Sequence, residues 1–180
     1  VLVDGQVLGT YFKRELPNYA VFDEQRYFVA GEQPFTFTVG GVCFGVNICE
    51  AIWFDAAPDA AAQQGAHTLL VLNASPYNLG KYAQRLEVAR RCVTRTGCSL
   101  VYANLVGGQD EVIFEGRSFA LNSDGKVVAR APAFKECLQT IEVQGGSVAA
   151  GLSVRGQDVT DESTWQEDLW RALVLGIKDY

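Results

Sequence analysis

Metal-binding and disulfide-forming residues are scarce in this sequence. Its 180 residues include no methionine, one histidine and five cysteines, none of them in a CxxC pair. One histidine and no CxxC spacing argue against a metal centre, and an odd number of cysteines argues against a disulfide framework. Free thiols fit a reducing compartment, so we expect a cytoplasmic protein.

Long apolar runs and clustered positive charges are also missing. No run reaches the ~18 apolar residues that a membrane span needs, and no N-terminal signal pattern is visible. The chain carries 15 Lys and Arg against 21 Asp and Glu, which gives a net charge of −6. Because nucleic-acid binding relies on clustered Lys and Arg, we expect neither nucleic acid nor a membrane as a partner.

The residues that are present suit a globular domain with a real core. Apolar residues make up 48% of the chain and charged residues 20%. That balance is typical of globular proteins, and the length is sufficient for one domain. The sequence contains no methionine, opens in an apolar strand and closes in an amphipathic helix pattern. We therefore expect it to be an excerpt of a longer chain, with residues missing at both ends.

Apolar spacing predicts strands that alternate with helices and are followed by hairpins. Strands are expected at 1–3, 7–12, 35–39, 42–49, 67–73, 99–106, 119–121, 127–131 and 137–143. Helices are expected at 59–64, at 82–96 with its arginines opposite the apolar stripe, and at 163–180. Residues 13–34 are expected to form a long structured loop, and 144–162 a linker. The pattern predicts an α/β sandwich over 1–143, followed by the start of a second domain.

The strand at 42–49 ends in the cysteine of greatest chemical interest. A thiol at a strand end can be presented at the mouth of a cleft, and a nearby ammonium raises its thiolate fraction. A cysteine in an apolar strand is most often a core residue. The flanking Gly45, Glu50 and Trp53 favour a nucleophilic role for Cys49 instead. The other cysteines are expected to be small buried hydrophobic residues: Cys43, Cys92, Cys98 and Cys137.

Charged residues near this cysteine suggest a catalytic group. Lys13 precedes an ordered turn and is suited to hold a thiolate and then an oxyanion, the alternative being a solvated surface lysine. Glu24 and Glu50 are candidates for positioning the lysine or binding a substrate amine, the alternative being surface charge. His67 follows a helix-stopping glycine at a strand start, where solvated histidines are common, so we assign it no catalytic role.

Two turn segments supply the remaining candidates. Ser75 ends the strand after the cysteine strand and can line the same cleft, while Lys81 lies at the entrance to a helix and can meet a carboxylate. Turn and capping chemistry is the alternative for both. Residues 107–111 are expected to form a glycine loop. Their pattern is neither GxGxxG nor a P-loop, so it does not indicate ATP binding.

Four phrases of the sequence resemble the nitrilase, or carbon–nitrogen hydrolase, superfamily: KRELPNYAVFDEQRYF, GVNICEAIW, NASPYNLGK and VGGQDEVIFEGRSFALNSDGK. They cover most of 1–143, and LPNYxVFDE and VGGQDE are specific to the amino-terminal glutaminase domains of glutamine-dependent NAD+ synthetases. The segment WQEDLWRALVLGIKDY is similar to the first helix of their ammonia-using synthetase domain. The resemblance implies a nitrilase-like α-β-β-α sandwich whose N-terminal part lies upstream of Val1.

The resemblance also implies a Glu-Lys-Cys triad. Cys49 matches the nucleophile, Lys13 the lysine and Glu24 an auxiliary glutamate, while the general-base glutamate is expected upstream of Val1. The glutamine contacts implied by the family are Tyr19, Ser75 and Lys81, with Glu50, Phe22 and Trp53 lining the pocket. The chain departs from the family twice. Ala51 replaces an Asp that can cap the following helix, and Ala20 replaces a Gly.

The implied reaction converts glutamine to glutamate and ammonia through a cysteine thioester. In the full enzyme, ammonia would pass to a synthetase domain that amidates deamido-NAD to NAD+. ATP and Mg²⁺ belong to that domain, and no cofactor is expected in this one. A homo-oligomer is expected, and the 180 residues alone are expected to be inactive because the base is absent.

Two alternatives to this reaction remain open. The chain can be a stand-alone amidase that acts on another small amide, although the helix pattern at 163–180 argues against it. It can also be a non-catalytic scaffold of the same fold, which the presence of both Cys49 and Lys13 argues against.

Overall fold

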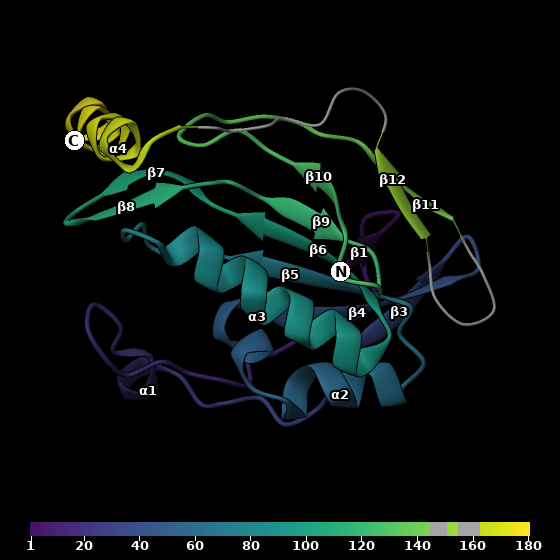
Figure 1. Ribbon diagram of the computed structural model, residues 1–180. Helices are drawn as coiled ribbons and strands as arrows, with labels where there is room; N and C mark the ends of the chain where they lie inside the picture. Colours follow the sequence, from purple (N-terminus) through teal and green to yellow (C-terminus); the bar gives the residue numbers. More distant parts are fainter. Residues whose placement is uncertain (145–150, 155–162) are drawn as a thin grey trace.

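A six-stranded mixed sheet forms the centre of the molecule (Figure 1). The computed structural model describes residues 1–144, 151–154 and 163–180. The strand order is β10-β9-β6-β5-β4-β3. These strands are β3 (Thr36–Val39), β4 (Val42–Ile48), β5 (Thr68–Asn73), β6 (Ser99–Asn104), β9 (Phe119–Leu121) and β10 (Val127–Arg130). Strands β4, β5 and β6 are parallel to one another, and the other neighbouring pairs of this sheet are antiparallel. The carboxyl ends of β4, β5 and β6 therefore share one edge of the sheet.

Three two-stranded ladders and five helical segments complete the described part of the chain. The ladders are β1 (Leu2–Val3) with β2 (Gln6–Val7), β7 (Val106–Gln109) with β8 (Val112–Glu115), and β11 (Ile141–Gln144) with β12 (Gly151–Val154). The helical segments are α1 (Glu24–Tyr27), the 3₁₀ helix η1 (Cys49–Trp53), α2 (Ala56–Gln63), α3 (Lys81–Thr96) and α4 (Trp165–Asp179). The predicted α/β class is confirmed. None of the helices described is long and apolar enough to cross a membrane.

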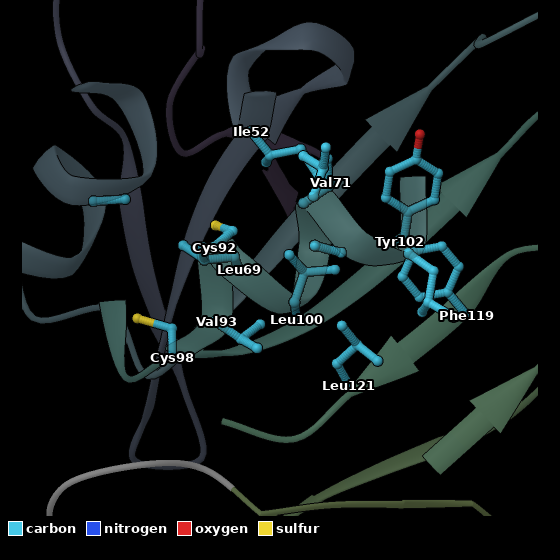
Figure 2. Close-up of a cluster of buried hydrophobic side chains, with 14 of the residues drawn as sticks. Ile52, Leu69, Val71, Cys92, Val93, Cys98, Leu100, Tyr102, Phe119 and Leu121 are labelled. Atoms are coloured by element: carbon cyan, nitrogen blue, oxygen red, sulfur yellow. The ribbon is translucent and has the colours of Figure 1, made fainter. Parts of the chain in front are cut away.

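The main core lies between the sheet and the helices α2 and α3, which cover the same face (Figure 1). The expected stripe of α3 is buried: Leu86, Ala89 and Val93 are at most 9% exposed. They belong to the same cluster as the central strand residues Leu69 and Leu100 (Figure 2). Burial of this apolar surface supplies the main driving force that fixes α3 against the face of the sheet.

The second face of the sheet is partly covered by the β11–β12 hairpin. Ile141 and Val143 pack with the buried Ala120 and Ala129 of β9 and β10. β11 begins at Ile141, so the strand expected from 137 is shorter than predicted. The linker expected at 144–162 lies largely outside the described residues, and β12 falls within it.

Several local expectations differ from the structure. The strand expected at 7–12 ends at Val7, and residues 107–109 belong to β7 rather than to a glycine loop. Antiparallel pairing of Gly107 and Gly108 with β8 accounts for that difference. Among the cysteines expected in the core, Cys92 and Cys98 are buried, whereas Cys43 is half-buried and Cys137 is exposed.

Helix α4 packs on the β7–β8 hairpin, far from α2 in Figure 1. Its N-terminus carries a capping box between Thr164 and Glu167, which satisfies two backbone N–H groups. The Arg117 guanidinium forks onto the Asp168 carboxylate at 2.7 and 2.9 Å. At the other end of the helix, the Gly108 N–H donates to Asp179 Oδ2 at 2.9 Å. One end of α4 is thus fixed to β7 and the other to the segment that follows β8.

Candidate active site

A cavity of about 330 Å³ opens at the carboxyl edge of the parallel strands. Cys49 and every one of the six residues expected to contact substrate line it: Tyr19, Phe22, Glu50, Trp53, Ser75 and Lys81. They come from the 13–34 loop, the segment after β4, the segment after β5 and the start of α3. Because these segments are far apart in the sequence, the strand order of the sheet is what brings them together.

Cys49 occupies the junction between β4 and η1. Its φ is +48°, in the left-handed region that residues other than glycine seldom adopt. This conformation turns the chain sharply at the strand end, so the thiol faces the cavity and not the sheet. The 3₁₀ helix starts here although position 51 lacks the Asp that the family usually has. Ala51 lies inside the helix, fully buried, and is not at the N-cap, which is Ile48.

The charges around Cys49 oppose one another. Burial raises the pKa of the Cys49 thiol, the Lys13 ammonium lowers this pKa, and the carboxylates of Glu24 and Glu50 raise it. The net direction is upward, so the thiol is largely protonated at neutral pH. Forming a thiolate at Cys49 therefore requires a group that removes this proton.

Lys13 is held by Glu24, the residue that the sequence predicts to be an auxiliary glutamate. Its Nζ donates to both carboxylate oxygens of Glu24 at 2.6 Å. The two side chains are 17% and 21% exposed, so the pair is shielded from solvent on most sides. A partly buried ammonium with a fixed partner is preorganised to stabilise a developing negative charge. Glu24 is the first residue of α1, a helix that the sequence did not predict.

One wall of the cavity is aromatic and acidic. The Tyr19 hydroxyl donates a short hydrogen bond to Glu50 Oε1, and this bond raises the pKa of Tyr19 to about 12. The Tyr19 ring meets Phe22 edge-on, with centroids 6.1 Å apart. Tyr19 therefore stays protonated, and the carboxylate that accepts its hydrogen bond belongs to a residue of the cavity lining.

The cavity also carries a cation. Lys81 Nζ lies 4.4 Å from the centroid of the Trp53 ring, a cation–π contact. Ser75 lines the same cavity and is only 8% exposed. A carboxylate and an ammonium in one cavity match a substrate with both an amino group and a carboxylate.

Residues that the sequence analysis did not name support Ser75 from behind. Arg85 of α3 was expected on the solvent side with the other arginines, but it is 1% exposed. Its guanidinium donates to Ser75 Oγ at 3.1 Å and pairs with the buried Glu115. Its neighbour Leu86 belongs to the apolar stripe, so helical spacing gave only a weak signal that Arg85 faces inward.

The tip of the β7–β8 hairpin forms another wall that the sequence did not predict. Glu111, Val112 and Ile113 line the cavity, as does Tyr77. The Tyr77 N–H donates to the Ile113 carbonyl at 2.7 Å, which joins the hairpin to the segment after β5. The VGGQDE phrase marks this segment in the sequence, but we predicted a glycine loop there, whereas the structure has a hairpin.

His67 lies away from these groups, as expected. It precedes β5 at the amino edge of the parallel strands, and its Nδ1 accepts a hydrogen bond from the Cys43 N–H at 3.2 Å. It cannot pair with Cys49 at the carboxyl edge. Within 1–144 and 163–180, no group of three His, Cys, Asp or Glu side chains is placed to hold a metal ion.

Comparison with known proteins identifies related chains. The family model for carbon–nitrogen hydrolases matches residues 2–151. The chain is 48% identical over 136 residues to glutamine-dependent NAD(+) synthetase of Acinetobacter baylyi, which covers 76% of this chain and 25% of that protein. It is 40% identical to the enzyme of the same name from Rhodobacter capsulatus, over all of this chain and 32% of the relative.

A solved structure gives the same relationship. Glutamine-dependent NAD+ synthetase from Acinetobacter baumannii, in complex with ADP, superposes with a TM-score of 0.91 at 38% identity. The match covers 99% of this chain and 33% of that one. The chain thus spans a third or less of the length of these relatives.

Proposed function

Because the chain belongs to the carbon–nitrogen hydrolase family, we propose that it hydrolyses the side-chain amide of glutamine, with Cys49 as the nucleophile. The observation that carries this proposal is the position of Cys49. It lies at the end of β4, in a cavity that both the Glu50 carboxylate and the Lys81 ammonium line. The Lys13–Glu24 pair lies close enough to act on the pKa of its thiol.

The proposed reaction has two covalent steps. Cys49 Sγ attacks the amide carbon, and Lys13 with a backbone N–H stabilises the oxyanion. The carbon–nitrogen bond then breaks, ammonia leaves with the proton taken from the thiol, and a γ-glutamyl thioester remains. Water cleaves the thioester, giving glutamate and the free thiol. A general-base carboxylate must carry these protons, and we assign it to a segment outside these residues because Glu24 and Glu50 are already hydrogen-bonded.

Recognition of glutamine follows from the charges of the cavity walls. The Glu50 carboxylate suits the α-ammonium of the substrate, while Lys81 and Ser75 suit its α-carboxylate. Phe22 and Trp53 can enclose the methylene groups between them. A simple uncharged amide would offer no charge to either Glu50 or Lys81, and this favours glutamine over the stand-alone amidase alternative.

We propose that the whole protein is a glutamine-dependent NAD+ synthetase. The support is the identity of 40% along all 180 residues to a relative of that name. In this proposal, ammonia passes to a further domain that amidates deamido-NAD with ATP and Mg²⁺. The same proposal carries the expectation of a homo-oligomer.

The test is ammonia release from glutamine by the full-length protein and its Cys49→Ala variant. Cys43→Ala, in the same strand, is the matched control. We expect activity in the wild type and the control and none in Cys49→Ala. Dependence of NAD+ formation on glutamine would support the synthetase assignment. Full activity of Cys49→Ala would refute the mechanism, while activity on an uncharged amide alone would favour the stand-alone amidase.

A further inference from the structure

Arg85 is a buried charged residue that contacts the cavity lining without being part of it. Arg85 is 1% exposed, as is its partner Glu115 of β8. A buried guanidinium costs considerable free energy unless all its donors are matched. Replacing such a pair with apolar residues is often harmless to stability, so the contacts that Arg85 makes besides the ion pair are of interest.

Those contacts converge on the segment that lines the cavity. Besides the bond from Nε to Ser75 Oγ, one terminal nitrogen of Arg85 donates to the Ser75 carbonyl and to the Pro76 carbonyl, each at 2.8 Å. Ser75 and Pro76 both line the cavity. The forked guanidinium therefore fixes the backbone of this segment and the hydroxyl of Ser75 together.

Two other side chains hold parts of the same segment. Asn104 Oδ1 accepts from the Ser75 N–H at 3.0 Å, and Asn104 Nδ2 donates to the Ser75 carbonyl at 3.4 Å. The hydroxyl of Tyr102 hydrogen-bonds that of Ser75. Asn104 contacts only the backbone of Ser75, so it can preserve the path of the chain when Arg85 is changed. The direction of the Ser75 hydroxyl depends on Arg85 and Tyr102.

We infer that Arg85 is a positioning residue, which sets the affinity for the amide substrate by holding Ser75 at the cavity wall without touching the substrate. This inference rests on the proposed function, since it takes Ser75 as a contact of glutamine. It assigns the Arg85–Glu115 pair to recognition more than to stability. Glu115 serves as the counter-charge that allows a guanidinium to occupy this buried position.

The test compares two probes of the same cavity in the full-length protein. The first is glutamine turnover, and the second is alkylation of Cys49 by iodoacetamide, followed by peptide mass mapping. Arg85→Lys keeps the charge beside Glu115 but cannot form the fork. We expect the KM for glutamine to rise about tenfold, the loss of one substrate hydrogen bond, with kcat changed less than about twofold. Alkylation of Cys49 should stay at the wild-type rate.

A double-mutant cycle connects Arg85 to Ser75. Ser75→Ala should raise KM about as much as Arg85→Lys, and the combined variant should show no further increase. Arg90→Lys is the matched control, because Arg90 lies on the same helix, is exposed and donates its hydrogen bond to the Gly125 carbonyl, away from Ser75. It should retain the wild-type KM.

A second variant covers the case in which Arg85→Lys does not fold. Arg85→Met with Glu115→Leu replaces the buried pair by apolar residues of similar size, a change that is often neutral or stabilising. We expect a folded protein with the same rise in KM. An unchanged KM in either folded variant would overturn the inference, as would additive effects of Arg85→Lys and Ser75→Ala. Equal losses with both probes, or failure of both variants to fold, would assign Arg85 to stability alone and also overturn it.

The wild type separates this inference from the proposed function. Wild-type protein that releases no ammonia from glutamine would refute the proposed function and, with it, the role of Arg85. Active wild type with an unaffected Arg85 variant would refute the positioning role alone.

Discussion

Two residues of the cavity have left-handed backbone conformations, which residues other than glycine seldom adopt. Cys49 has φ +48° and Ala20 has φ +51°, and both line the cavity. The strain at Cys49 has an evident purpose, because the turn presents its thiol. Ala20 stands where the family usually has Gly, which adopts this conformation without a steric penalty.

The first prediction concerns this alanine. Ala20→Gly should increase the free energy of unfolding by about 0.5–1 kcal/mol, since relief of the left-handed strain exceeds the entropy that glycine adds to the unfolded chain. Chemical denaturation of the full-length protein measures it. Ala83→Gly is the control, because it makes the same substitution at an exposed site in α3, where the backbone is helical. This variant should have a lower free energy of unfolding than the wild type. A loss of stability in Ala20→Gly would show that the conformation is not strained.

The second prediction concerns Lys13. Lys13→Met should lower kcat for glutamine about 10²–10³-fold, as expected for the loss of one oxyanion-stabilising group. The pKa of Cys49 should rise further, because the ammonium that lowers it is gone. Alkylation of Cys49 at neutral pH should slow accordingly. Lys126→Met, in the β9–β10 turn, is the control, and an unchanged kcat in Lys13→Met would exclude the role.

At the scale of elements, the hairpin β7–β8 connects the cavity to α4. Its tip lines the cavity, while Gly108 and Ile113 pack against Gly176 of the helix. A side chain on Gly108 would approach the Gly176 backbone to 3.1 Å, so the small residues permit this close contact. The Arg117–Asp168 pair fixes the N-terminal end of the helix, with both side chains 11% exposed.

The third prediction tests that attachment. Asp168→Asn should destabilise the docked helix by about 1–3 kcal/mol, because Arg117 loses its charged partner in a largely buried place. Hydrogen exchange at the amides of α4 should become faster, while α3 stays protected. Glu87→Gln on the exposed face of α3 should change neither. Unaltered exchange in Asp168→Asn would mean that the pair does not hold the helix.

The elements with clear periodicity were predictable from the sequence. The α3 stripe, the strand that ends at Cys49 and the helix at the C-terminal end are confirmed, because each repeats one spacing over many residues. The β7–β8 hairpin and the buried position of Arg85 were not predictable in this way. The hairpin depends on the pairing of two strands, and the burial of Arg85 depends on a partner 30 positions away in the sequence. The cavity residues were named from family phrases, and their common location depends on the strand order.

At the scale of the molecule, the thiols buried between α3 and the sheet couple stability to alkaline pH. Burial raises the pKa of Cys92 from 9.0 to about 12 and also raises the pKa of Cys98. At a pH between 9.0 and about 12, Cys92 keeps its proton in the folded protein but loses it in the unfolded chain. The folded state then binds more protons, so its stability falls as pH rises.

The fourth prediction follows from that sign. Cys92→Ala should be less stable than wild type near neutral pH, because it leaves a small cavity. The difference between their free energies of unfolding should narrow as pH rises from about 8 to about 10.5. The wild type loses stability over this range because its unfolded chain releases the Cys92 proton, and the variant has no such proton. Denaturant titrations at several pH values give both curves. Cys137→Ala, at an exposed thiol, should leave the pH dependence unchanged, and parallel curves for Cys92→Ala would contradict the assignment.

The docking of α4 also bears on where the protein can be divided. Homology to the carbon–nitrogen hydrolases extends to residue 151, but the contacts of the hairpin extend to Asp179. A cut placed at the edge of the homologous region would remove the Asp168 carboxylate from Arg117 and expose the glycines of β7 to solvent. The region that matches the family and the set of residues that pack together therefore have different borders, and a split or grafted version of this protein should keep α4 with the hairpin it covers.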